Sequence, residues 1–230
     1  MTIPDTIDAD RIYWDAQYKE IKAIVDDNIK IGKIRKIYCI GDCLTVGIDS
    51  ENNYGYPYFL QIFLGEKYKV INLGRTMLKL EHLIKFQNLL TPKNVHSSDI
   101  ACVWCGTNDL YFDADIEIVI KNYNDYCKLL QNLNIKVVAV TILPRSLDAA
   151  ATFETNRQIF NKFVKDNYEY VANIGDNKII GQRDQETNPR FYVQPNNNHI
   201  TSMGHRVVAK TVEKTIKSLI KKEKEKHGRI

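Results

Sequence analysis

Cys43 lies at the end of an apolar run in the segment IYCIGDCLTVG, residues 37–47, directly after a glycine and an aspartate. A side chain at the end of a strand is well placed to react. A thiol is a strong nucleophile once a neighbouring base has taken its proton. Three interpretations fit this position: a nucleophile, a replacement for one, or a small residue in a turn. The polar groups expected nearby bear on that choice.

Further polar segments follow apolar runs in the same way. Asn72-Leu73-Gly74 closes a second run, and the turn that starts at Gly106 and contains Asn108 closes a third. The segment QPNNNHITSMGH, residues 194–205, precedes the last helical pattern and contains His199. In a parallel sheet the carboxyl ends of the strands share one edge, and ligands bind there. We therefore expect these segments to meet Cys43 at one edge of a sheet.

Strand-like and helix-like patterns alternate along the chain and predict such a sheet. Short, nearly continuous apolar runs are typical of buried strands, and they occur at 36–41, 69–74, 99–106 and 135–143. A helical pattern follows each run, at 55–65, 77–90, 116–133 and 153–167. This β-α-β-α order predicts an α/β fold with a parallel sheet and helices on both faces.

Two amphipathic helices are expected to flank this unit. An apolar stripe at helical spacing lies near each end of the chain, formed by Trp14, Tyr18, Ile21, Val25 and Ile29, and by Val208, Val212, Ile216 and Leu219. Thr201 or Ser202 could cap the second helix. Without a repeat or a linker, the pattern predicts an N-terminal helical extension over 1–34, one domain over 35–222 and a charged tail over 223–230.

The polar segments, taken in order, resemble the sequence blocks of the SGNH hydrolase superfamily, also called GDSL-type esterases and lipases. GDCLT is similar to the Gly-Asp-Ser-Leu block, NLG to the second block and GTND to the third, while NNNHIT with Gly204 is similar to the last. TILPR and NRQIFNKFV are similar to the connecting region of small bacterial members. The resemblance spans residues 36–212. Each block alone is weak, but four in the right order at predicted strand ends are specific.

The resemblance implies a flavodoxin-like, three-layer α/β/α sandwich that hydrolyses esters through a Ser-His-Asp triad. Cys43 then takes the nucleophile position, His199 the position of the base, and Asn196 the position of the triad aspartate. The N–H groups of Cys43 and Gly74 and the side-chain amide of Asn108 would form the oxyanion hole. The chain thus departs from the family pattern at two triad positions.

The two departures are chemically consistent with each other. A thiol is easier to deprotonate than a hydroxyl, so Cys43 could rest as a thiolate beside a protonated His199, supported by a helix starting after Leu44. In a serine triad the aspartate stabilises the imidazolium, and its replacement by asparagine lowers the rate about 10⁴-fold. A thiolate would already balance the imidazolium charge, so Asn196 would only need to orient the ring.

The resemblance therefore predicts an ester hydrolase, an acyl or acetyl esterase that acts on a small-molecule or carbohydrate acyl ester through a covalent acyl-enzyme at Cys43. Three alternatives stay open: a catalytically impaired binding protein on the same fold, an engineered serine-to-cysteine variant of an esterase, and an O-acyltransferase. A nucleotide or flavin binder is disfavoured because no turn matches a phosphate-binding loop. No cofactor is expected.

Other polar residues near these segments receive supporting roles. Asp42 and Asp109 are expected to bond turn amides rather than act in catalysis. His205 is expected to pack or to lie on a helix surface. Asp176 is a minority candidate for the carboxylate partner of His199, should a loop bring it there.

Two other residue types invite a functional interpretation. Cys102 and Cys105 form a C-x-x-C, but they lie in an apolar run without further ligands, so we expect packing and no metal site. Arg75 and Arg145 could face an anionic group of a substrate, although single arginines more often form surface ion pairs.

The composition limits the remaining classes. The formal net charge is +4, and the lysines of the C-terminal KKEKEKHGRI alternate with glutamates, which disfavours nucleic-acid binding. No apolar run is long enough to span a membrane, and the N-terminal residues do not resemble a signal peptide. We therefore expect a cytoplasmic protein. The oligomeric state is left open.

Overall fold

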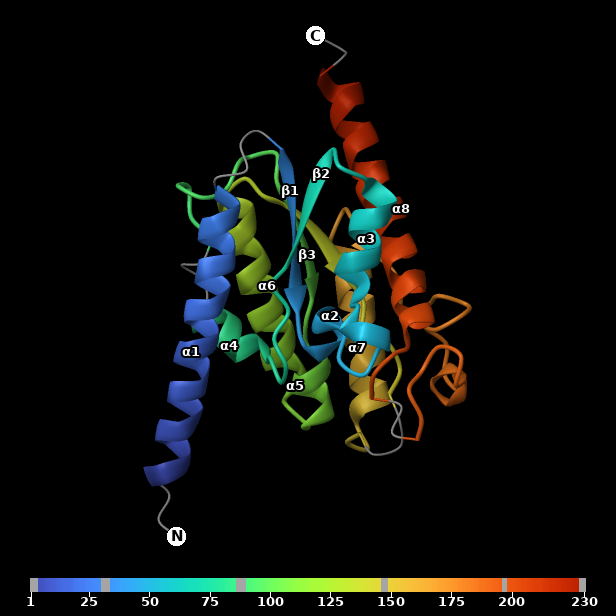
Figure 1. The fold of residues 1–230 in the computed structure, drawn as a ribbon. Helices are drawn as coiled ribbons and strands as arrows, with labels where there is room; N and C mark the ends of the chain where they lie inside the picture. The colour runs from blue at the N-terminus through green and yellow to red at the C-terminus, as the bar shows by residue number, and fades with distance from the viewer. Residues whose placement is uncertain (1–3, 30–33, 86–89, 146–148, 196–197, 228–230) are drawn as a thin grey trace.

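A computed structural model describes residues 4–29, 34–85, 90–145, 149–195 and 198–227 (Figure 1). Within these residues a five-stranded parallel sheet has the order β2-β1-β3-β4-β5. Its strands are β1 (Arg35–Gly41), β2 (Tyr68–Asn72), β3 (Ile100–Trp104), β4 (Lys136–Val140) and β5 (Val171–Ala172). This is the flavodoxin-like strand order, so the predicted fold class is confirmed.

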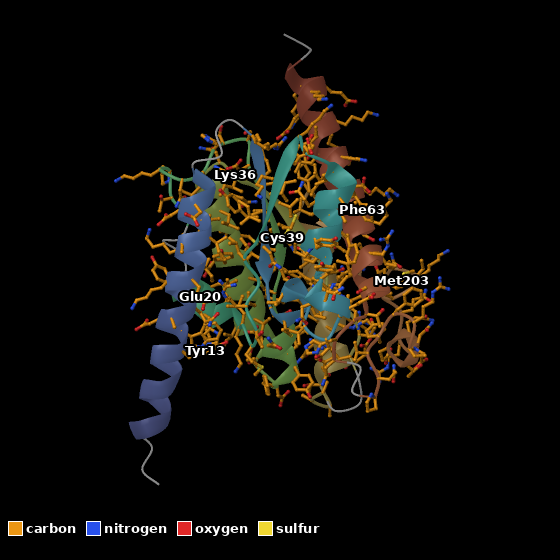
Figure 2. The ribbon with its side chains drawn as sticks, viewed as in Figure 1. Tyr13, Glu20, Lys36, Cys39, Phe63 and Met203 are labelled. Atoms are coloured by element: carbon orange, nitrogen blue, oxygen red, sulfur yellow. The ribbon has the colours of Figure 1, made fainter. Side chains whose placement is uncertain are left out.

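Helices cover both faces of the sheet, which makes three layers (Figure 1). One layer contains α1 (Pro4–Ile29), α4 (Leu80–Lys85), α6 (Ile116–Asn132) and α7 (Phe153–Asn167). The other contains α3 (Tyr56–Leu64) and α8 (Ser202–His227). Side chains of β1 alternate between the two cores: Tyr38 packs in one and Cys39 in the other. Figure 2 shows Cys39 in the middle of the molecule, with Glu20 on α1 and Phe63 on α3 on opposite sides.

The N-terminal helix packs against the sheet layer rather than standing apart from it. Trp14, Ile21 and Val25 are buried in the same core as β1 and α6. The indole of Trp14 also stacks on the imidazole of His82, with ring centroids 3.7 Å apart. The apolar stripe read from the sequence therefore marks the packed face of α1. The division into extension, domain and tail stays a prediction.

Several short elements lie at the carboxyl edge of the sheet. The helix expected to start after Leu44 is the short α2 (Cys43–Val46). The elements that were not predicted are the 3₁₀ turn η1 (Glu51–Asn53), α5 (Thr107–Tyr111) and the 3₁₀ turn η2 (Gln185–Thr187). The two-residue strand β5 was also missed. Such elements are too short to show a hydrophobic period, and tertiary contacts form them. The predicted helix over 77–90 starts later, at Leu80, and residues 86–89 lie outside the described part.

The carboxyl edge also contains the topological switch point of the sheet. The chain pairs β1 with β2 on one side and with β3 on the other, so the strand order reverses at β1. Ligands of open α/β sheets bind in the crevice at such a point. Cys43 lies close to the switch point, because β1 ends at Gly41 and only Asp42 separates the two residues.

Candidate active site

The turn that carries Cys43 is closely packed. A Cβ atom on Gly41 would lie 2.1 Å from Oγ1 of Thr45 and 2.5 Å from the carbonyl oxygen of Trp104, so only glycine fits. Asp42 caps α2, and its Oδ1 accepts a hydrogen bond from the Leu44 N–H at 2.9 Å. This confirms the role predicted for Asp42. The cap holds Cys43 at the first position of the short helix α2.

The Cys43 thiol is protonated in the resting protein. Its side chain is buried, and burial together with the nearby Asp42 carboxylate raises the pKa of the thiol to about 12, although the Arg145 guanidinium opposes the shift. This raised pKa argues against the resting thiolate that Cys43 could form beside a protonated His199. The expected helix does not compensate, because α2 has only four residues. A nucleophilic Cys43 needs a base that removes its proton during attack.

The loop after β2 packs against the turn of Cys43. The side-chain amide of Asn72 donates to the carbonyl oxygen of Thr45 at 3.1 Å, and its Oδ1 accepts the Gly74 N–H at 2.8 Å. A Cβ atom on Gly74 would lie 2.7 Å from the backbone nitrogen of Val46. Gly74 therefore lies at the predicted edge, but its N–H is engaged by Asn72.

The third polar segment also lies at this edge. Asn108 is buried on α5, and its Nδ2 donates one hydrogen bond, to the carbonyl oxygen of Leu78 at 3.0 Å. The second N–H of that amide has no acceptor among the described residues. Asp109 accepts the Leu80 N–H at 3.1 Å and so caps α4, as predicted for a carboxylate that bonds turn amides. Burial raises the pKa of Asp109 to about 6.

His199 reaches the site through a bond that sequence reasoning missed. Its Nδ1 lies 2.7 Å from Oδ2 of Asp49, which belongs to the turn after α2. His199 also acts electrostatically on the buried Asp42 carboxylate, next to Cys43. Among the hydrogen bonds of the described residues, none joins His199 to Cys43, and such bonds are often absent without substrate. The contact with Asp49 and the effect on Asp42 therefore place the His199 imidazole near the turn that carries Cys43.

The two sequence candidates for the partner of His199 have different outcomes. Asn196 lies outside the described residues. The Asp176 carboxylate bonds the ammonium of Lys165 at 2.7 Å and the amide of Asn173 at 2.9 Å. Asp176 is therefore engaged elsewhere, and the minority prediction for it is not supported. The sequence offered one weak indication of Asp49, its position shortly after Cys43. The family resemblance does not assign a role to that position.

A second histidine lies close to the site. His205, in the first turn of α8, is fully buried, and neither ring nitrogen has a hydrogen-bond partner among the described residues. Burial, with a smaller effect of His199, lowers its pKa to about 3. His205 is therefore neutral at ordinary pH and packs in the core, in agreement with the packing role expected for it.

The two arginines behave differently from each other. Arg75 donates to the Gly74 carbonyl oxygen at 2.7 Å and faces Glu20 of α1 at 3.8 Å, the ion-pairing role expected of it. Arg145 is buried and acts on both Asp42 and Cys43, so it is a part of the site and not a surface ion pair. A buried guanidinium that acts on both Asp42 and Cys43 is a feature that the sequence did not indicate.

The C-x-x-C pair does not form a site. Cys102 packs in the core under α3 and α8, whereas Cys105 packs in the core under α6 and α7. Their side chains therefore point to opposite faces of the sheet. Among the described residues no group of histidine, cysteine or acidic side chains could hold a metal ion.

Comparison with known families decides the relationship. The model of the GDSL-like lipase/acylhydrolase family matches residues 37–212. The chain belongs to this family. The match covers all four sequence blocks and, within the described part, strands β2 to β5 and all of β1 but its first two residues. No curated protein sequence matches the chain significantly.

Solved structures of the same fold are similar at low sequence identity. A G-D-S-L lipolytic protein from Desulfitobacterium hafniense has a TM-score of 0.65 at 14% identity, with 78% of this chain and 98% of that chain covered. The psychrotrophic esterase EstA from Pseudoalteromonas sp. has a TM-score of 0.64 at 14% identity, with 81% of this chain and 99% of that chain covered. A carbohydrate acetylesterase family member from Sinorhizobium meliloti has a TM-score of 0.60 at 14% identity, with 80% of this chain and 98% of that chain covered. At this identity the likeness shows the shared fold.

Family membership makes the chain a hydrolase that acts on ester bonds, with a small-molecule ester as substrate. Family membership does not specify how cysteine at the nucleophile position reacts or which class of ester is the substrate. In the part of the chain that the structure describes, no helix is both long and apolar enough to cross a membrane.

Proposed function

We propose that this GDSL-family chain hydrolyses an acyl ester through a covalent thioester at Cys43. The observation that supports it best is the bond between His199 and Asp49, because it brings an imidazole from the far end of the sequence to the turn that carries the thiol. A thiol, an imidazole and an uncommitted amide N–H at one sheet edge are the groups that acyl transfer needs.

The chemistry follows from the protonated thiol. His199 takes the Cys43 proton as sulfur bonds to the ester carbonyl carbon, and the carbonyl electrons move to oxygen. The tetrahedral intermediate collapses, the carbon–oxygen bond to the alcohol breaks, and the imidazolium returns the proton to the leaving alkoxide. Water then attacks the thioester with His199 as base. The thiolate leaves and regains a proton, so acid and alcohol are the only products.

The oxyanion hole of the proposal has two available donors. The Cys43 N–H lies in the first turn of α2 and has no acceptor within the helix. The second N–H of the Asn108 amide is the other donor. Gly74 remains in the proposal as a third donor, with the condition that its N–H must exchange Asn72 Oδ1 for the substrate oxygen.

The proposed substrate is a short acyl ester, such as an acetyl group on a carbohydrate hydroxyl. The acetylesterase from Sinorhizobium meliloti, which has the same fold, supports this choice. The side chain of Cys43 is buried, which favours a small acyl group over a long chain at the nucleophile. Transfer of the acyl group to a sugar hydroxyl instead of water would use the same thioester.

The test is intact-protein mass spectrometry during incubation with p-nitrophenyl acetate, with p-nitrophenol release followed in parallel. We expect steady release by the given protein, loss of release in Cys43→Ala, and retained release in Cys127→Ala, which removes a buried thiol of α6. Cys43→Ser reports whether the site accepts the hydroxyl common in the family.

Each other outcome changes the proposal. An acetyl adduct on Cys43 that is never hydrolysed favours a transferase that lacks its acceptor or an engineered serine replacement. Higher turnover by Cys43→Ser favours the engineered origin specifically. Release that persists in Cys43→Ala removes the thiol from the mechanism. If neither an adduct nor release is observed, hydrolysis of this ester is refuted and the binding protein is favoured.

A further inference from the structure

The carboxylate that contacts His199 comes from an unexpected segment. Oδ2 of Asp49 lies 2.7 Å from Nδ1 of His199, whereas the family resemblance places the partner of the base at position 196. We propose that Asp49 is the positioning residue of His199, so that nucleophile and carboxylate come from one turn. This inference rests on the proposed function, because it gives the base of that reaction its partner.

The backbone of the turn that carries Asp49 is closely packed, while the Asp49 side chain is 57% exposed. Gly47 has φ +98°, and a Cβ atom there would lie 2.2 Å from the backbone nitrogen of Gly55, so the turn folds tightly on itself. Ser50 Oγ donates to the Gly47 carbonyl oxygen at 2.7 Å. Asp49 itself adopts φ +61°, a conformation uncommon for residues other than glycine. Such backbone geometry persists where surrounding contacts impose it, and it concentrates at functional sites.

The contact determines which nitrogen of His199 reacts. A carboxylate only accepts hydrogen bonds, so Nδ1 carries the proton that it donates to Asp49, and Nε2 keeps the lone pair that can take the Cys43 proton. Because the thiol starts protonated, the imidazolium forms during attack. A carboxylate stabilises that cation, whereas the amide of an asparagine would only orient the ring. Asp49 therefore supplies what position 196 lacks.

Other charged groups also act on His199. Asp42 lies on the nucleophile turn and attracts the imidazolium, while His205 on α8 acts against its charge if protonated. Arg145, beside Asp42, offsets part of the Asp42 field. An absolute pH profile would mix these effects, so the test compares variants that differ only at Asp49 with a control of equal charge change.

The first measurement is steady-state hydrolysis of p-nitrophenyl acetate by Asp49→Asn, Asp49→Glu and the control Glu51→Gln. Glu51 is an exposed acid on the same turn, and its side chain bonds no described residue. We expect Asp49→Asn to lower kcat by about 10²- to 10⁴-fold with KM little changed, and Asp49→Glu to recover part of the loss. Glu51→Gln should behave like the given protein. Equal rates for Asp49→Asn and Glu51→Gln would overturn the proposal.

A second measurement keeps the inference separate from the proposed function. The protonated ring nitrogen of His199 is identified by nitrogen NMR in the given protein, Asp49→Asn and Glu51→Gln, whether or not esters are hydrolysed. Loss of the carboxylate that accepts from Nδ1 should abolish the preference for the Nδ1–H tautomer, whereas Glu51→Gln should keep it. If only Asp49→Asn changes the His199 tautomer and no esterase activity is found, the proposed function is refuted while the role of Asp49 stands. An unchanged tautomer in Asp49→Asn refutes the role of Asp49.

Discussion

Cys43 carries its proton in the resting protein, because its burial beside Asp42 raises the thiol pKa to about 12. This separates the site from cysteine enzymes that rest as a thiolate–imidazolium pair. The base then has to work as it does beside a serine, and a carboxylate on the imidazole becomes valuable. The structure provides that carboxylate at Asp49. At the residue scale, the proposed mechanism therefore corresponds to a serine triad with sulfur in place of oxygen.

Asn108 gives a direct test of the oxyanion hole. Asn108→Ala removes the free amide N–H and should lower kcat by about 10²- to 10³-fold, because one preorganised donor to the developing oxyanion is lost. The control is Asn167→Ala, which removes an exposed amide that bonds the Phe163 carbonyl oxygen at the end of α7. Thermal unfolding checks that both variants fold. An unaltered kcat in Asn108→Ala would remove Asn108 from the mechanism.

The elements around the site divide into those with large cores and those formed by contact. The helices α6, α7 and α8 and the strands β1 and β3 are buried along continuous apolar faces. The short helices α2 and α5 instead follow strand ends and are held by caps and close glycine contacts. Reactive groups thus sit on short turns, which long elements hold in position.

The packing of α1 can be tested at this scale. Trp14→Ala should lower the free energy of unfolding by about 3–5 kcal/mol, because a buried indole and its stacking on His82 are lost. Tyr13→Ala is the matched control: it removes an exposed ring from the same helix and should cost less than about 1.5 kcal/mol. Urea unfolding measures both. Equal small losses would mean that α1 adds little to the stability of the sheet layer.

The stability of the whole molecule should depend on the protonation of His205. Its folded pKa of about 3 lies below the ordinary value of 6.5, so the unfolded chain binds the extra proton first as the pH falls. The stability that neutral His205 contributes is present above pH 6.5 and is lost between pH 6.5 and 3. The expected slope from this one group is about 1.4 kcal/mol per pH unit.

The measurement is the free energy of unfolding of the given protein and of His205→Gln between pH 7 and 4. The difference between the two proteins isolates His205 from carboxyl groups such as Asp109, whose raised pKa acts with the opposite sign in part of this range. We expect the difference to shrink as the pH falls. Parallel curves would contradict the assignment of the acid sensitivity to His205.

The sequence by itself determined the layers and the edge at which the chemistry lies. Continuous apolar runs and helical stripes depend on local periodicity, so four strands, the main helices and the strand-end positions of Cys43, Gly74 and Asn108 could be predicted. Order along the chain also identified the family, because its blocks are short and sequential.

Only the tertiary structure decided the protonation of the thiol and the partner of the base. Burial of Cys43 is a property of the folded chain, with Asp42 and Arg145 as charged neighbours, and no local pattern encodes the desolvation that raises its pKa. Likewise, Asp49 and His199 are far apart in sequence, and they meet because the turn after α2 and the segment before α8 converge on one sheet edge. Contacts between residues far apart in sequence, and the burial that removes water from Cys43, exist only in the folded chain.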